Sequence, residues 1–168
     1  MSIKVMGIDP GLRFTGWGII SVDGNHIKHN ANGVIKTNSE ESLSNRLLEL
    51  YNSITRIISN FKPDEASIEN TFVNKNPLSS LKLGHARGAI MVAVANQSVV
   101  CSEYAPNLIK KTIVGQGHAD KTQVALMVSV LLSIKNLGSG DASDALAIAI
   151  THAHHRTNKL SKVLQNDR

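Results

Sequence analysis

The sequence of 168 residues contains one cysteine, Cys101, so no disulfide can form within the chain. A lone cysteine is typical of proteins in a reducing compartment. Long apolar runs are also missing. The longest cover residues 89–95 and 145–150, well short of the ~20 residues that span a bilayer. No apolar signal segment precedes the first strand pattern, which begins at Ile3. We therefore expect a cytoplasmic protein with no membrane association.

Charged residues are moderately scarce, at 18% of the chain, whereas apolar residues make up 42%. These fractions exclude a largely disordered chain. The length allows one domain with a substantial core and excludes two independent enzyme domains. We expect this domain to cover residues 1–157. Residues 158–168 form a polar tail without periodicity.

Acids are outnumbered, since 18 Lys and Arg residues stand against 13 Asp and Glu residues and give a net charge of +5. Between residues 70 and 119 there is one acid, Glu103, and five basic residues: Lys75, Lys82, Arg87, Lys110 and Lys111. Such a segment is typical of a surface that contacts a polyanion. A solvated basic face without a partner is the alternative.

The apolar pattern predicts an antiparallel meander at the start of the chain. Strands are expected over residues 3–9, 14–22 and 26–37, with turns at Pro10-Gly11 and Asp23-Gly24-Asn25. A helix capped by Ser39 then runs to Phe61, with an apolar stripe of Leu43, Leu47, Leu50, Ile54, Ile57 and Phe61. The remaining predicted elements are a strand over 65–69, a helix from the Asn76 cap to residue 96, a strand over 98–104, and helices over 106–114, 120–133 and 141 to about 156.

This order of elements predicts an α/β fold with one five-stranded mixed sheet, an antiparallel N-terminal meander, and helices packed on both faces. The strand over residues 65–69 follows a helical crossover, so it should lie parallel to the first strand. Sites in such sheets gather where strand ends and crossover loops converge.

Four acids occupy positions that suit a shared site. Asp9 ends an otherwise apolar strand, where a carboxylate is costly unless a positive charge meets it. Glu69 ends the strand over residues 65–69 in the same way. Asp141 and Asp144 are three residues apart and share one face of the last helix's first turn. We expect all four to converge at one edge of the sheet.

Each acid also has an ordinary structural explanation. A strand-end Asp before Pro-Gly often only forms a turn. Asp141 and Asp144 are favourable next to a helix N-terminus, and Glu69 can simply be an exposed strand end. The shared site is favoured because Asp9 and Glu69 end strands that are expected to be adjacent and parallel.

Carboxylate ligands without Cys or His suit Mg²⁺ or Mn²⁺ better than Zn²⁺. Two such ions roughly 3.5–4 Å apart can clamp the attacking and leaving oxygens of a phosphoryl displacement. Without the four acids, the chain carries 18 basic against 9 acidic residues. An acidic pocket within a basic surface is what a metal-dependent nuclease needs.

Several blocks resemble the RuvC family of Holliday-junction resolvases and occur in the family order from about residue 3 to residue 152. They are Gly7-Ile8-Asp9-Pro10-Gly11 with Thr15-Gly16, Ile68-Glu69 with Phe72, residues 81–88, Glu103-Tyr104-Ala105, residues 110–115, Ala119-Asp120-Lys121 and residues 141–147. The resemblance implies an RNase H-like fold, a homodimer, and paired symmetric nicking of four-way DNA junctions. The nicks would leave 5′-phosphate and 3′-hydroxyl ends in homologous recombination and DNA repair. It also implies a branch-migration helicase complex of the RuvA and RuvB type as a partner.

The resemblance assigns roles to individual residues. Asp9, Glu69, Asp141 and Asp144 match the four metal-binding acids, with Asp9 bridging two Mg²⁺ ions for which Mn²⁺ can substitute. Lys121 matches a catalytic lysine near the scissile phosphate, and Phe72 matches an aromatic that stacks on a junction base. Lys110 matches a DNA contact. The neighbouring basic residues Lys75, Lys82, Arg87 and Lys111 are further expected DNA contacts. His85 departs from the family pattern, where Gln is expected.

Other side chains have two interpretations. Phe72 can instead plug a loop from below, and Gly84 and Gly88 can pack either at a dimer interface or on the chain's own sheet. His152, His154 and His155 are expected in the last turn of the final helix, complementing its dipole rather than binding metal. His118 contacts DNA or is solvated.

Two other functions compete with the junction nuclease. One is an RNase H-like nuclease acting on structured RNA, and the other is a junction-binding protein without catalysis. The second is disfavoured because a pure binder would gain more from Asn or Ser facing phosphate than from four acids.

Overall fold

The computed structural model describes residues 2–70 and 76–166. Its five strands form one sheet in the order β3-β2-β1-β4-β5. The strands are β1 (Ile3–Asp9), β2 (Phe14–Asp23), β3 (His26–Lys36), β4 (Glu65–Glu69) and β5 (Val100–Tyr104). β1 is antiparallel to β2 and parallel to β4, and β5 is parallel to β4. The carboxyl ends of β1, β4 and β5 therefore lie at the same edge of the sheet.

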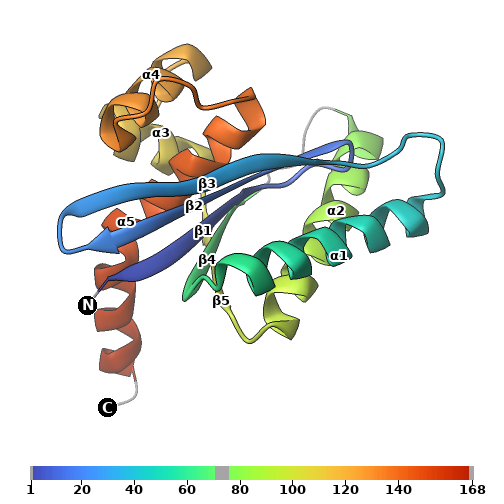
Figure 1. Cartoon of the computed structure of the whole chain (residues 1–168), viewed down its shortest axis with the longest axis horizontal. Coiled ribbons are helices and arrows are strands. Elements are labelled where there is room, and N and C mark those ends of the chain that lie inside the picture. The colour runs from blue at the N-terminus through green and yellow to red at the C-terminus, as the bar shows by residue number, and fades with distance from the viewer. Residues whose placement is uncertain (1, 71–75, 167–168) are drawn as a thin grey trace.

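Helices cover both faces of the sheet, as the sequence predicts (Figure 1). They are α1 (Leu43–Phe61), α2 (Pro77–Asn96), α3 (Pro106–Val114), α4 (Lys121–Leu132) and α5 (Gly140–Asn166). One apolar core lies between the sheet and α1 with α2, and the other lies between the sheet and α3, α4 and α5. In the described part of the chain, no helix combines the length and apolar character that crossing a membrane requires.

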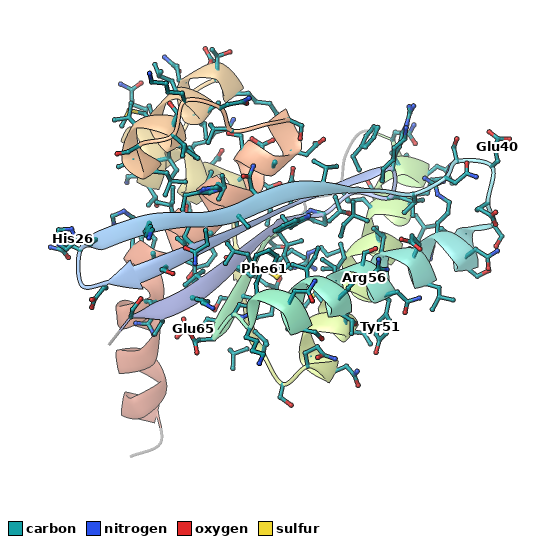
Figure 2. All side chains as sticks on the ribbon, in the orientation of Figure 1. His26, Glu40, Tyr51, Arg56, Phe61 and Glu65 are labelled. Carbon is teal, nitrogen blue, oxygen red and sulfur yellow. The ribbon has the colours of Figure 1, made fainter. Side chains whose placement is uncertain are left out.

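The N-terminal meander is confirmed. β2 ends at Asp23, β3 begins at His26, and Gly24 between them has a left-handed φ of 57°. Figure 2 labels His26 beside this turn and Glu40 in the loop that follows β3, at the opposite end of the long hairpin. The open end of the hairpin, at Phe14 and Lys36, thus lies close to the carboxyl end of β1. The turn at Gly24 lies at the other end of the sheet.

The predicted cap of α1 at Ser39 is wrong. Ser42 is the cap, and its Oγ accepts a hydrogen bond of 3.2 Å from the backbone N–H of Asn45. Both serines are chemically suitable, but a turn separates Ser39 from the first helical residue. The deepest contacts of α1 come from Leu50, Ile54 and Ile58, whereas Leu43 at the start of the predicted stripe is exposed.

Two other boundaries differ from the prediction. Ser98 has a left-handed φ of 57° in the turn after α2, so β5 begins only at Val100. The last helix continues beyond the predicted end at Arg156 to Asn166. Its additional residues are mostly polar, with Leu160, Val163 and Leu164 among them, and they include no proline or glycine to end a helix.

Helix α5 packs directly against the backbone of β1 and β2. A Cβ atom at Gly16 would lie 1.9 Å from the carbonyl oxygen of Asp141, and one at Gly7 would lie 2.0 Å from the carbonyl oxygen of Ala145. Only glycine allows this approach, because the atoms in the way belong to the backbone of the helix. The close packing sets the first turn of α5 against the sheet at the carboxyl end of β1.

We expect Gly16→Ala to push the first turn of α5 away from β2 and to lower the free energy of unfolding by about 2 kcal/mol, a typical cost of overpacking. Urea denaturation followed by circular dichroism measures this change. Gly140→Ala is the matched control, because a Cβ atom at Gly140 meets nothing within 4 Å. Equal stability of the two variants would contradict the close contact.

Candidate active site

Asp9 is the last residue of β1, and a buried threonine holds the turn that follows it. The Thr15 hydroxyl donates a hydrogen bond of 2.6 Å to the carbonyl of Gly11 and accepts one of 3.2 Å from the Gly11 N–H. Thr15 is fully buried. The chain therefore leaves β1 along a fixed path, with the Asp9 carboxylate at the edge of the sheet.

Glu69 ends the parallel strand β4, and hydrogen bonds hold its backbone on both sides. The next residue, Asn70, donates its N–H to the carbonyl of Tyr104 over 2.8 Å. Arg87 on α2 donates from Nε to the carbonyl of Glu69 over 3.3 Å and forms an ion pair with Glu103 on β5. These contacts fix the end of β4 beside the end of β1.

Asp141 and Asp144 lie in the first turns of α5. The turn begins after Ser139, whose carbonyl accepts a hydrogen bond of 3.1 Å from the N–H of Ser143. The contact between Gly16 and the Asp141 carbonyl sets this turn against β2. Asp144 consequently faces the ends of β1 and β4, and Asp141 lies close enough to raise the pKa of Asp9.

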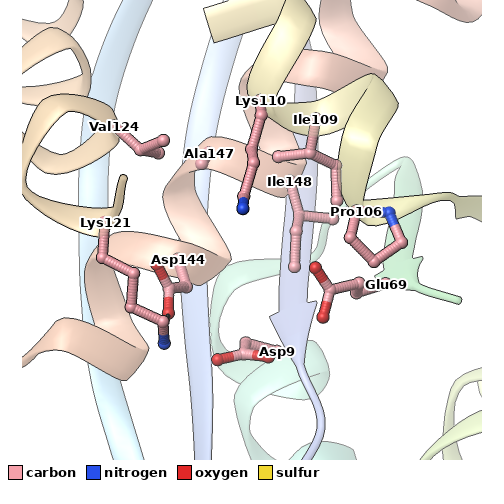
Figure 3. A pocket seen from close by; sticks show the side chains of 10 residues that line it. All are labelled: Asp9, Glu69, Pro106, Ile109, Lys110, Lys121, Val124, Asp144, Ala147 and Ile148. Atoms are coloured by element: carbon pink, nitrogen blue, oxygen red, sulfur yellow. Dashed lines mark hydrogen bonds and ion pairs between the residues drawn. The ribbon is translucent and has the colours of Figure 1, made fainter. Parts of the chain in front are cut away.

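A cavity of about 250 Å³ opens where these segments meet. In Figure 3 the carboxylates of Asp9, Glu69 and Asp144 point into it from β1, β4 and α5. Lys110 on α3 and Lys121 on α4 also line it. Asp141 does not line the cavity, so three of the four predicted acids share it and the fourth lies beside it.

Burial and like-charge repulsion strongly perturb Asp9. Desolvation is the larger cause, and the carboxylates of Glu69, Asp144 and Asp141 add to it, raising the pKa of Asp9 to about 8. The positive charge of Lys121 acts in the opposite direction. Burial and then Asp144 raise the pKa of Glu69 as well. Both carboxyl groups therefore hold a proton more readily than a carboxyl group in water does.

Lys121 forms an ion pair with one of these acids, Asp144. Its Nζ donates a hydrogen bond of 3.0 Å to Asp144, which is the main cause of the raised pKa of Lys121. Asp9 and Asp141 raise that pKa further. Lys110 lines the cavity too and lowers the pKa of Glu69, so two ammonium groups stand against the four carboxyl groups.

These residues fit a hard divalent cation by their chemistry. The converging donors are carboxylate oxygens, and their mutual repulsion would be relieved by added positive charge. Within the residues that the structure describes, no three His, Cys, Asp or Glu side chains already form a group that could hold a metal ion. Asp144 is turned toward Lys121, so forming such a group requires side-chain rotation.

The predicted DNA-contacting residues are spread more widely. Lys110 lies at the cavity and lowers the pKa of Glu69, whereas Lys82 and Lys111 are exposed outside it. Arg87 is largely buried and bonded within the fold. Phe72 and Lys75 lie outside the described residues, so their predicted roles stay predictions.

The sequence reasoning missed the apolar wall of the cavity. Pro106 and Ile109 on α3 and Val124 on α4 line one side of it, with Ala147 and Ile148 of α5. Ile109 and Ile113 are one turn apart and both buried, a spacing that could have placed one face of α3 against the sheet. This wall forms the apolar side of the cavity that Glu69 lines.

The histidines of α5 do not sit in its last turn, so the dipole explanation for them is wrong. His152 is buried, with its Nε2 2.6 Å from Glu65 and its Nδ1 2.9 Å from the Tyr104 hydroxyl. Arg156 also pairs with Glu65. These contacts tie α5 to β4 and β5 at a distance from the cavity.

Gly84 and Gly88 do not pack on the chain's own sheet. Both are exposed, and among residues 2–70 and 76–166 a Cβ atom at either position would meet nothing within 4 Å. The alternative interpretation of close packing within the subunit is therefore wrong.

Comparison with solved structures identifies the fold as RNase H-like α/β, with its acids at the ends of the two central parallel strands. The structure titled Thermus thermophilus RuvC in complex with Holliday junction substrate superimposes with a TM-score of 0.86 at 32% identity. The match covers 92% of this chain and 94% of that one.

The family model described as crossover junction endodeoxyribonuclease RuvC matches residues 5–152. The protein of that name from Nitrobacter hamburgensis is 51% identical over 154 residues, covering 92% of this chain and 91% of the relative. The one from Rhodospirillum rubrum is 49% identical over 162 residues, with 96% of both chains covered. This chain belongs to the RuvC family.

The raised pKa of Asp9 predicts how the metal-free protein responds to pH. A carboxyl group whose pKa is higher in the folded state adds stability below its unfolded pKa near 3.8, and that stability is lost as the pH rises through about 8. In EDTA at about pH 8.5, we expect Asp9→Asn to melt roughly 3 °C or more above the wild type, corresponding to about 1 kcal/mol.

This difference should shrink toward about pH 4, where both side chains are neutral in the folded state. Thermal unfolding followed by circular dichroism measures it, with the exposed Glu40→Gln as the control. Addition of Mg²⁺ at about pH 8.5 should raise the melting temperature of the wild type more than that of Asp9→Asn. Identical melting temperatures in EDTA at both pH values would contradict the electrostatic account of Asp9.

Proposed function

We propose that this protein is a metal-dependent endonuclease that resolves Holliday junctions by paired symmetric nicks. Each subunit hydrolyses one phosphodiester and leaves a 5′-phosphate and a 3′-hydroxyl. The observation that carries the proposal is the convergence of Asp9, Glu69 and Asp144 on one cavity flanked by Lys110 and Lys121. The relatives named crossover junction endodeoxyribonuclease, and the junction complex of the Thermus protein, support DNA junctions as the substrate.

The charge distribution supports a nucleic-acid substrate. The chain as a whole carries +5 although its candidate site is acidic. Basic residues outside the cavity attract the phosphate backbone over a wide area, and a small acidic site holds cations locally. This combination lets a polyanion approach a cluster of carboxylates that would otherwise repel it.

The four acids, Asp9, Glu69, Asp141 and Asp144, would hold Mg²⁺, for which Mn²⁺ can substitute, in two ions per site. When bound, these ions supply Lewis-acid stabilisation of the phosphoryl oxygens. Asp9 must first give up its proton, since its pKa of about 8 keeps much of it neutral near pH 7. Its deprotonation therefore links cation binding to pH.

Lys121 would supply a fixed positive charge for the scissile phosphate. Its ammonium group is held at the cavity by Asp144 and stays protonated because the surrounding carboxylates raise its pKa. A preorganised cation of this kind stabilises negative charge that develops in the transition state. Lys110 would orient the bound phosphate from the opposite helix, α3.

A homodimer would present two such sites to the two-fold symmetric junction. The exposed stripe on α2 supports this assembly. Leu78, Leu81 and Val92 recur at helical spacing and are 56–60% exposed, and the open positions Gly84 and Gly88 lie between them. We also propose a branch-migration helicase complex as a partner, on the basis of the family resemblance.

We expect Asp9→Asn to bind a synthetic four-way junction in EDTA as the wild type does, but to leave it uncut with Mg²⁺. Lys121→Ala should cut about 10²-fold more slowly, because one preorganised electrostatic group is removed. End-labelled junctions resolved on denaturing gels measure both the rate and the symmetry of the nicks. Lys28→Ala, at the far end of β3, is the control and should cut at the wild-type rate.

Substrates of matched length test the competing functions. An RNA–DNA hybrid and a linear duplex should be cut far more slowly than the junction. Preferential cleavage of the hybrid would replace the proposal with an RNA-directed nuclease. Binding without cleavage by the wild type in Mg²⁺ would leave only a junction-binding protein.

We expect the wild type to sediment as a dimer at micromolar concentration and Leu81→Lys to raise the dimer dissociation constant about 100-fold, as loss of an interface hot spot does. Leu126→Lys, an equally exposed position on α4, is the matched control. Analytical ultracentrifugation separates the two outcomes. A Leu81→Lys variant that associates as tightly as the control would move the interface away from α2.

A further inference from the structure

An aromatic ring with two cations lies exposed beside the candidate active site. Phe14, the first residue of β2, is 38% exposed. The guanidinium carbon of Arg13 lies 5.2 Å from the centre of its ring, and the Nζ of Lys36 lies 5.9 Å from it. We call Arg13, Phe14 and Lys36 the strand-start patch.

The strand-start patch faces the same side of the sheet as the acids. Gly16 pairs with Asp9 and meets the carbonyl of Asp141 on α5. Phe14 is two residues before Gly16 on the same strand, so it shares that face just beyond the first turn of the helix. Lys36 is the direct β3 partner of Phe14.

The distance from the acids is short on the scale of a nucleic acid. Two residues along β2 and one step between strands separate the backbone of Phe14 from that of Asp9 by about 8 Å. A nucleic-acid strand advances about 3.4 Å per nucleotide along a duplex. The patch is therefore about two to three nucleotides away from a phosphate held at the acids.

The backbone beneath the patch is held firmly. Arg46 on α1 donates from Nε to the Thr37 hydroxyl over 3.0 Å and from a terminal nitrogen to the Leu12 carbonyl over 3.3 Å. Thr37 in turn donates its N–H to the carbonyl of Arg13 over 3.2 Å. Since the turn and the strand end are tied together, the backbone positions of Arg13, Phe14 and Lys36 are held relative to one another.

In the described part of the chain, the two positive charges of the patch, those of Arg13 and Lys36, form no ion pairs. Glu41 and Glu49, which line a shallow hollow with Lys36, hydrogen bond instead to Asn45 and Ser53. An exposed ring with two unneutralised cations suits a ligand that carries both flat bases and phosphates.

We propose that the strand-start patch binds the DNA strand two to three nucleotides from the cleaved phosphate. Arg13 and Lys36 contact backbone phosphates, and Phe14 packs its ring against a base or sugar. This proposal rests on the proposed nuclease function, because DNA in the cavity sets where the neighbouring nucleotides lie. It adds a contact on the meander side of the acids, opposite the basic helices α2 and α3.

Junction binding by single variants in the Asp9→Asn background, with EDTA present, tests the patch. Arg13→Ala and Lys36→Ala should each weaken binding several-fold at about 0.1 M salt and lower the slope of log affinity against log salt by about 1. Phe14→Ala should weaken binding about 10-fold or more without changing that slope, since stacking involves no counterion release. Fluorescence anisotropy with a labelled junction measures these values.

Two controls make the result specific. Lys28→Ala removes an equally exposed lysine from the other end of β3, near the labelled His26 in Figure 2, and should bind as the parent does. Phe14→Tyr should restore binding, whereas Phe14→Leu should not, because leucine keeps bulk but lacks a ring face. Melting temperatures close to that of the parent protein show that each variant is folded.

The outcomes separate this proposal from the nuclease function. If the wild type cuts junctions in Mg²⁺ but Arg13→Ala, Phe14→Ala and Lys36→Ala all bind like Lys28→Ala, the patch has no role in DNA binding and this inference is overturned. If the wild type cuts no junction, the proposed nuclease function is wrong, and the inference that rests on it falls with it. Weakened binding with an unchanged salt slope in Arg13→Ala and Lys36→Ala would also overturn the assignment of phosphate contacts.

Discussion

Repulsion between carboxylates that the fold forces together is the constraint on which the rest of the site depends. Asp9, Glu69 and Asp144 come from three separate elements, and burial reduces the screening of Asp9 and Glu69 by water. Two ammonium groups, those of Lys110 and Lys121, line the same cavity, and the pKa of Asp9 is raised nonetheless. The stability of the site and its proton binding are therefore two aspects of the same electrostatic repulsion.

Backbone packing holds the elements that carry the acids together against the repulsion between their carboxylates. Glycines at positions 7 and 16 bring α5 into contact with β1 and β2, and the hydrogen bonds around Thr15 and Asn70 hold the strand ends. These contacts are made by the backbone and by the Thr15 hydroxyl, and none of them uses an acidic side chain. The elements that carry the carboxylates are thus held largely by contacts that do not depend on the charge of the acids.

Much of this arrangement could be predicted from the sequence. Asp9 and Glu69 end strands that a helical crossover makes parallel, so topology alone brings them to one edge. The pairing of Lys121 with Asp144, and of His152 with Glu65 and Tyr104, could not be predicted, because each joins residues far apart in the chain. Local signals also failed where two residues offered the same chemistry, as Ser39 and Ser42 do, or where no breaker marked an end, as after Arg156. The roles of the individual acids and lysines stay predictions.

Arg87 links the outer helix α2 to the end of the inner strand β4. It stands on α2, whose outer stripe of Leu81 and Val92 is open, while its guanidinium reaches inward to the carbonyl of Glu69 and to Glu103. A small roll of α2 about its own axis would pull on the end of β4. If two subunits pair through this helix face, as proposed above, Arg87 would connect that interface to the end of β4.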